Sequence, residues 1–100
     1  MSDVLEGNPI ARVTLEPLDD YIVIEPLDES ELPSGLIVPA NEAAQVRSGI
    51  VASVGPDATV IEPGDKVLFA RDAGFEVRLA RSSHRVWVLK RDQLIARIHD

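Results

Sequence analysis

The sequence predicts an all-β protein, and three observations support this class. Short apolar segments rich in Val and Ile recur along the whole chain of 100 residues. Gly, Pro and Asp separate these segments, as they do at turns between strands. No apolar pattern with a helical period persists through the roughly ten to twelve residues that a helix needs. Closely spaced short strands of this kind are typical of a small barrel.

Seven segments are expected to form strands because they concentrate β-branched and other aliphatic side chains. In chain order they are residues 13–16, 21–25, 47–54, 66–70, 76–80, 85–90 and 94–98. Turns are expected between them, where Gly can adopt positive φ and Pro presets φ. The turn sequences are Asp19-Asp20, Gly55-Pro56-Asp57, Pro63-Gly64-Asp65, Ala73-Gly74 and the polar Ser82-Ser83-His84.

One connection is far longer than the others. From residue 26 to about residue 46 no strand is expected, and loops of this length in compact domains are usually functional or disordered. An acidic, Pro-containing stretch here leads into three aliphatic residues, Leu36, Ile37 and Val38, between Gly35 and Pro39. Three apolar neighbours cannot all face one core. The composition leaves two interpretations open: a short buried strand that fixes the loop, or an exposed anchor for a partner.

The length predicts a single domain, and the absence of Cys fits a reducing compartment without establishing one. Residues 1–11 are expected to be a flexible N-terminal extension, and residues 12–100 one domain. The chain has no Cys, which excludes disulfides and thiolate metal sites. No apolar run exceeds four residues and the N-terminus is acidic, so we expect a cytoplasmic protein.

The charge distribution disfavours nucleic acid and anionic membranes as partners. The net charge is -7, of which residues 1–46 contribute -9 and residues 47–100 contribute +2. Binding to phosphate depends on clusters of Lys and Arg, and the acidic N-terminal half contains only one basic residue.

Catalytic and cofactor motifs are absent from the sequence. His84 and His99 are the only histidines, and neither has a second ligand at metal-binding spacing. Ser82 and Ser83 precede His84, but adjacency in sequence does not assemble a nucleophile, a base and an oxyanion hole. No glycine-rich phosphate-binding motif occurs. Trp87 is expected to be a core or subunit-contact residue. We therefore expect no enzyme activity and no cofactor, and any ATP must be bound by a partner.

The order of the motifs resembles that of the GroES-like co-chaperonin family, the ten-kilodalton chaperonins. The resemblance spans about residues 12–98, and its motifs occur in the family's order and spacing. They are residues 15–24 (LEPLDDYIVI), 34–39 (SGLIVP), 49–56 (GIVASVGP), 63–69 (PGDKVLF), 73–77 (AGFEV) and 88–96 (VLKRDQLIA). No single motif is specific, since P-G-D-x-V also occurs in other β-domains.

The resemblance implies a small, partly open GroES-like β-barrel with a mobile loop at about residues 26–46, assembled into a sevenfold ring. The N-terminal strand of one subunit would pair with the C-terminal strand of its neighbour, through Val13, Leu15, Leu94, Ile95 and Ile98. The ring would be a lid that caps an ATP-bound, GroEL-like chaperonin and encloses client proteins.

The resemblance also assigns the contact with the chaperonin. It would be made by the loop tip, which consists of Gly35, Leu36, Ile37, Val38 and Pro39. Catalytic and metal-binding residues are not expected, and the subunit itself would bind no cofactor.

Three features depart from the family pattern. Ser34 replaces the first Gly of the loop tip, and because Ser is less free than Gly at positive φ, a stiffer or differently turned tip is expected. Arg97 replaces a usually apolar residue. The segment 55–63 is short where many relatives carry a hairpin that forms the roof of the dome. Two alternatives stay open at this point: the related barrel of medium-chain dehydrogenases, and a stand-alone adaptor.

Overall fold

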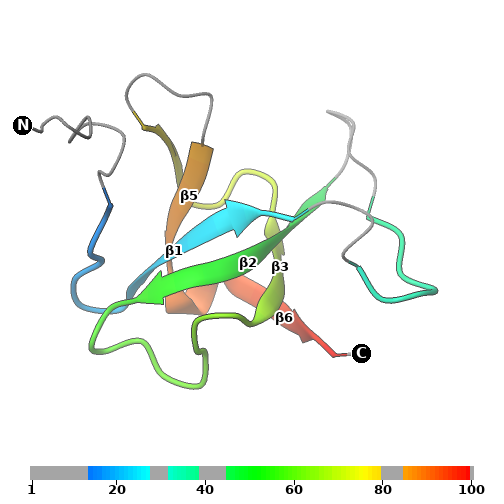
Figure 1. Cartoon of the computed structure of the whole chain (residues 1–100), viewed down its shortest axis with the longest axis horizontal. Helices are drawn as coiled ribbons and strands as arrows, with labels where there is room; N and C mark the ends of the chain where they lie inside the picture. Colours follow the sequence, from blue (N-terminus) through cyan, green and yellow to red (C-terminus); the bar gives the residue numbers. More distant parts are fainter. Residues whose placement is uncertain (1–13, 28–31, 39–44, 80–84, 100) are drawn as a thin grey trace, which may run out of the picture.

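The computed structural model describes residues 14–27, 32–38, 45–79 and 85–99, whose regular elements are strands apart from one short 3-10 turn (Figure 1). The strands are β1 (Tyr21–Pro26), β2 (Val46–Val54), β3 (Lys66–Ala70), β4 (Phe75–Arg78), β5 (Arg85–Lys90) and β6 (Leu94–Ile98). A short 3-10 turn, η3 (Arg91–Gln93), separates β5 from β6. The all-β prediction is confirmed.

The six strands form one open sheet in the order β4-β5-β1-β2-β3-β6. Every neighbouring pair is antiparallel. β1 therefore lies near the middle of the sheet between β2 and β5, while β4 and β6 form its two edges. An edge strand presents unpaired N–H and C=O groups that can pair with another chain.

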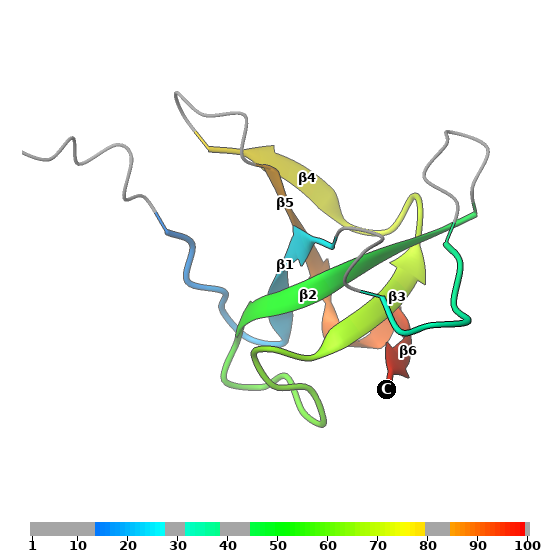
Figure 2. The same ribbon diagram turned by 45° about the vertical axis from the view of Figure 1, so that its right-hand side comes forward.

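The sheet is strongly curled, so that strands far apart in its order face each other (Figures 1 and 2). Phe69 on β3 and Trp87 on β5 are separated by β1 and β2, yet their ring centroids are 6.0 Å apart. In a flat sheet, three strand spacings would place the strands about 14 Å apart. The curl makes the sheet a partly open barrel, in agreement with the predicted fold class.

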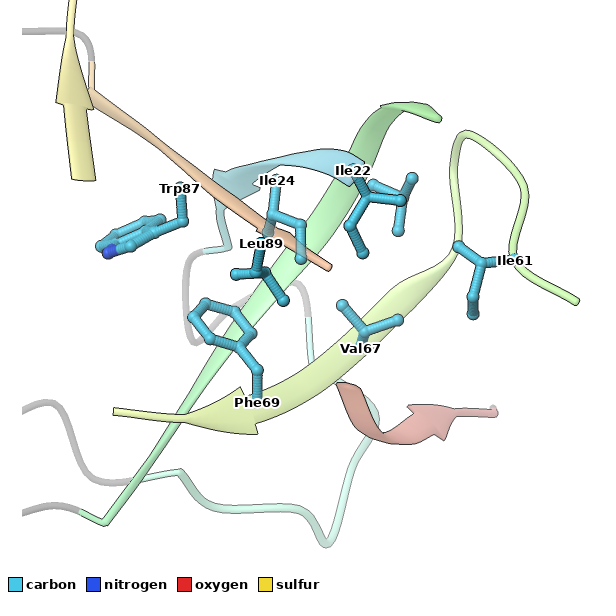
Figure 3. Packing of buried hydrophobic residues seen from close by; sticks show 8 residues of the cluster. Ile22, Ile24, Ile61, Val67, Phe69, Trp87 and Leu89 are labelled. Atoms are coloured by element: carbon cyan, nitrogen blue, oxygen red, sulfur yellow. The ribbon is translucent and has the colours of Figure 1, made fainter. Parts of the chain in front are cut away.

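The hydrophobic core fills the concave side of the curled sheet. Figure 3 shows side chains from β1, β3 and β5 pointing toward one another. The cluster consists of Ile22, Ile24, Val51, Ile61, Val67, Phe69, Trp87 and Leu89. Alternation of side chains along a strand explains why these residues share the core. Ile22 and Ile24 are two residues apart, as are Val67 and Phe69, so each pair lies on one face of the sheet.

Most predicted strand bounds agree with the structure. The predictions for β3, β5 and β6 match residue for residue, and those for β1 and β2 differ by one residue at one end. β4 begins at Phe75, one residue earlier than predicted, because Phe75 pairs with Val88. β4 ends at Arg78, so Leu79 is not part of the strand, and the predicted end at Ala80 lies outside the described residues.

The first predicted strand, residues 13–16, is wrong for the single chain. Residues 14–18 are described and form no strand, while Val13 lies outside the described residues. The physical reason is the absence of pairing: no described strand is hydrogen-bonded to residues 14–16, although the outer edges of β4 and β6 are open. Apolar side chains can predict a strand, but a ladder of hydrogen bonds is needed to form one.

Candidate functional site

The loop between β1 and β2 carries a hydrogen-bonded turn at its described tip. Residues 32–38 extend beyond the end of β1 and the start of β2 (Figure 1). The N–H of Leu36 donates to the carbonyl of Pro33 at 3.1 Å, and Gly35 has a φ of 96°. A positive φ at the third residue is the feature of a type II turn, a position that favours Gly.

Ser34 lies within this turn. It occupies the second turn position and is not among the described residues with positive φ, whereas Gly35 is. A Cβ at position 35 would have nothing within 4 Å, so this corner of the turn faces open space. The positive φ of this turn falls on Gly35 and not on Ser34. The expectation of a stiffer or differently turned tip stays a prediction.

The three aliphatic residues after the turn have different environments. Ile37 is 82% exposed, Val38 is only 7% exposed, and Leu36 is half-buried. Each of the two sequence interpretations thus fits a different residue: Val38 is buried, and Ile37 is presented to solvent. Pro39 lies outside the described residues.

The two ends of the loop join the sheet at different strands. Pro26, the last residue of β1, pairs with Gly49, while Val46, the first residue of β2, pairs with Ala70 of β3. The N–H of Arg71 donates to the carbonyl of Gln45 at 2.9 Å, which attaches the loop's C-terminal end. The start of β2 therefore extends past β1 and supports the loop from one side.

Arg47, one residue into β2, lies over the ring of Trp87 with its guanidinium carbon 5.1 Å from the ring centroid. Trp87 in turn contacts Phe69 in the core. A guanidinium over an indole is an attractive cation–π arrangement, and it connects the root of the loop to the barrel core.

The residues predicted to make the subunit contact lie on two different sides of the folded subunit. In Figures 1 and 2, residues 14–18 and β6 lie on opposite sides of the subunit. Leu15 is half-buried, and Val13 lies outside the described residues. On β6, Ile95 is 59% exposed and Ile98 is half-buried, while Leu94 packs against the core cluster. One subunit alone does not bring these residues together.

Sequence reasoning missed a second ordered feature, in the segment 55–63. Val60 has a φ of 77°, which a β-branched residue rarely adopts. The carbonyl of Thr59 accepts a hydrogen bond from Arg91 Nε at 2.8 Å, and the carbonyl of Val60 accepts one from Arg97 at 3.1 Å. The only sequence signal was that Arg97 departs from the family pattern.

The described residues contain neither a group of three or more His, Cys, Asp or Glu side chains that could hold a metal ion, nor a helix long and apolar enough to cross a membrane. Of the histidines considered as ligands, His99 is exposed and His84 lies outside the described residues.

Comparison with known proteins identifies the family. The model of the family described as Chaperonin 10 Kd subunit matches residues 14–98. The chain is 33% identical to the co-chaperonin GroES of Campylobacter curvus over 75 residues, covering 74% of this chain and 87% of that protein. It is 34% identical to the co-chaperonin GroES of Polynucleobacter necessarius subsp. necessarius over 94 residues, covering 84% of this chain and 96% of that protein.

A third relative, the co-chaperonin GroES of Streptomyces avermitilis, is 36% identical over 80 residues, which are 68% of this chain and 76% of that protein. These matches confirm the resemblance derived from the sequence motifs. They also decide against the dehydrogenase-type barrel and against an enzyme. The chain belongs to the chaperonin 10 kDa subunit family, the family of the GroES co-chaperonins.

Proposed function

We propose that the chain is one subunit of a sevenfold ring that caps an ATP-bound, GroEL-like chaperonin and closes its folding chamber. The loop at about residues 26–46 would bind the chaperonin through Gly35, Leu36, Ile37, Val38 and Pro39. The observation that carries this proposal is the turn at residues 33–36, which presents Ile37 with 82% of its surface exposed. An exposed aliphatic side chain on a defined turn suits an apolar groove on a partner.

Within the tip, Ile37 is proposed as the main anchor. Leu36 is half-buried and would add contact area, while Val38 is already buried in the free subunit and gains little on binding. Val38 therefore supports the tip by fixing the direction in which Ile37 points. Gly35 contributes the positive φ that the turn requires.

The positions of residues 14–18 and of β6 on opposite sides of the subunit support the proposed ring. Residues 14–18 form no strand in the single chain and lie on the side opposite β6, whose outer edge is open in the described sheet. An N-terminal segment of one subunit that pairs with β6 of the next gives a head-to-tail contact, which closes into a ring when its rotation matches. Pairing would also remove an exposed edge strand.

The energetics explain why several loops must act together. Burying Ile37 fully yields about 1.5 to 3 kcal/mol, and the partial burial of Leu36 adds less. Ordering even the three tip residues 35–37 costs about 3 to 6 kcal/mol, at about 1 to 2 kcal/mol per residue. Gain and cost are of similar size, so one tip is near break-even. Seven tips on one ring convert later contacts into intramolecular ones, and the lid can still leave when the chaperonin changes conformation.

The remaining parts of the proposal follow from the same function. The subunit binds no nucleotide and no other cofactor, because ATP is bound by the chaperonin. Residues 12–100 act as one domain with a flexible extension at residues 1–11. The ring works in the cytoplasm, and its clients are the proteins enclosed in the chamber. Neither nucleic acid nor a membrane is a partner.

Two measurements test this function. Native mass spectrometry should give a sevenfold assembly at micromolar protomer concentration. The ring should then bind an immobilised GroEL-like chaperonin in the presence of ATP and dissociate when the nucleotide is removed. A monomer, or binding that does not depend on the nucleotide, contradicts the lid and favours the stand-alone adaptor.

A further inference from the structure

Val60 has a strained backbone at an exposed position. Its φ of 77° places a β-branched residue in the left-handed region, and the residue is 63% exposed. Such strain persists only where the surrounding structure determines it. The next residue, Ile61, is 7% exposed and belongs to the core cluster. The chain must therefore turn sharply at Val60 to bring Ile61 inward.

Two arginines bind the main chain at this turn. Arg91 in η3 donates from Nε to the carbonyl of Thr59 at 2.8 Å. Arg97 in β6 donates to the carbonyl of Val60 at 3.1 Å. Hydrogen bonds from charged donors are stronger than those between neutral groups. Two consecutive carbonyls, those of Thr59 and Val60, are thus held by arginines from the C-terminal part of the chain.

Asp65 fixes the position of Arg97. One carboxylate oxygen of Asp65 lies 3.3 Å from Arg97 and accepts a hydrogen bond from the N–H of Glu62 at 2.9 Å. The N–H of Asp65 also donates to the carbonyl of Glu62 at 3.1 Å. The side chains of Arg97 and Asp65 are 33% and 26% exposed, so the ion pair is only partly screened by solvent. The turn at residues 62–65 therefore holds the anion that orients Arg97.

The position of Arg97 in the sheet explains why it can reach this segment. Arg97 pairs with Val67, a core residue, so it lies on the core-facing side of the edge strand β6. From this edge its side chain spans the open side of the barrel to residues 60 and 65. An apolar residue at position 97 could not donate these hydrogen bonds.

We propose that Arg91 and Arg97 are positioning residues that hold residues 56–62 in a single shape, with Val60 in the left-handed conformation. Through its side chains the pair, here named the arginine clamp, ties this segment to η3 and to the edge strand β6. The segment follows the end of β2 remote from the loop, so the clamp shapes the end of the subunit opposite the tip (Figure 1). Any effect of the clamp on closure of the lid rests on the proposed function. The hydrogen bonds that form the clamp do not depend on that function.

Hydrogen exchange of individual amides in the assembled protein tests the clamp. The N–H groups of Ala58 and Glu62, which bond to Gly55 and Asp65, report on the segment, and that of Gly55, which bonds to Tyr21, reports on its root. Arg97→Leu should accelerate exchange at Ala58 and Glu62 by about ten-fold, the change expected on losing a hydrogen bond from a charged donor. Gly55 should be little affected.

Arg78→Leu on the exposed edge strand β4 is the matched control and should leave all three amides unchanged. Unchanged exchange at Ala58 and Glu62 in Arg97→Leu overturns the clamp. Equal acceleration throughout the sheet also overturns it, because Arg97 would then contribute only to general stability.

Val60→Gly provides a second, independent arm. Gly adopts positive φ without strain, so the segment should need the clamp less. Arg97→Leu should therefore accelerate exchange far less in the Val60→Gly background than in the native one, and it should lower the thermal midpoint less as well. Strictly additive effects of the two changes overturn the proposal, even if Arg97→Leu alone folds poorly.

A functional arm separates the clamp from the proposed function. Rings of Arg97→Leu should bind the ATP-charged chaperonin as the native ring does, because the tip is remote, but should protect an enclosed client less well against a small protease. If the native ring does not cap a chaperonin, the proposed function fails while the exchange experiment still decides the clamp. If native and Arg97→Leu rings protect the client equally, the clamp has no role in closing the lid.

Discussion

Ile37 and Val38 are neighbours in sequence, yet 82% of Ile37 and only 7% of Val38 is exposed. Both residues directly follow the turn that ends at Leu36. In the proposed function the two residues have separate roles: Ile37 is the anchor for the partner, and Val38 attaches the tip to the subunit. Substitutions at the two residues should therefore affect different measurements.

The first prediction concerns Ile37. Ile37→Asp should abolish binding to the ATP-charged chaperonin, because a carboxylate in an apolar groove costs several kcal/mol and the loss is repeated at every loop. The thermal midpoint should change little, since surface substitutions usually alter stability by no more than about 0.5 kcal/mol. Ser34→Asp, which adds the same charge at an exposed position of the turn, is the control and should retain most binding. Persistent binding of Ile37→Asp would show that Ile37 is not the anchor.

The second prediction concerns Val38. Val38→Ala should destabilise the protein by about 1 to 3 kcal/mol, because it removes buried methyl groups and leaves a cavity. For a domain of this size, each kcal/mol lowers the thermal midpoint by about 4 to 8 °C. Ile37→Ala at the same protomer concentration should not lower it. An unchanged midpoint for Val38→Ala would mean that this residue does not attach the tip.

Local patterns predicted most of the fold. The bounds of β3, β5 and β6 were correct because polar or charged residues stand on both sides of each aliphatic segment. Of the three, only β3 alternates regularly between buried and half-buried side chains. The first predicted strand failed because pairing, not composition, decides whether an edge segment becomes a strand. The tip was partly predictable: Gly35 before three aliphatic residues indicated a turn, but the opposite exposures of Ile37 and Val38 depend on tertiary contacts.

The conformation of Val60 could not be predicted from its neighbours. A β-branched residue strongly disfavours positive φ, so local preference points to extended backbone. The groups that fix the turn come from far along the chain: Arg91 is 32 residues from Thr59, and Arg97 is 37 residues from Val60. Long-range hydrogen bonds of this kind leave no periodic signal in the sequence.

The third prediction concerns Gly49, where β1 and β2 approach closely. A Cβ at this position would collide with Cγ2 of Ile24 and lie 2.9 Å from the main-chain oxygen of Glu25. Gly49→Ala should therefore destabilise the barrel by about 1 to 3 kcal/mol, the usual cost of overpacking a core. Ser34→Ala is the control, since this position is exposed and has no positive φ. Denaturant midpoints of the two variants should differ clearly; equal midpoints would contradict the close approach.

The last prediction concerns the edge strand β6 and the proposed ring. Leu94 is an ambiguous probe of the subunit contact, because it packs against the core and a charge there could unfold the subunit. Ile95 is a better probe. It is 59% exposed and lies at a register shift, since Leu94 pairs with Phe69 and Ala96 pairs with Leu68.

Ile95→Asp should dissociate the ring into folded monomers, because each subunit contact would contain an unpaired carboxylate and every 1.4 kcal/mol lost weakens a contact about ten-fold. Phe75→Asp is the matched control: Phe75 is 72% exposed, but on β4 at the other edge of the sheet, and its replacement should leave the ring intact. Native mass spectrometry gives the assembly state, and circular dichroism of the monomer shows whether it stays folded. A ring that survives Ile95→Asp, or one that dissociates equally with Phe75→Asp, would place the subunit contact elsewhere than at β6.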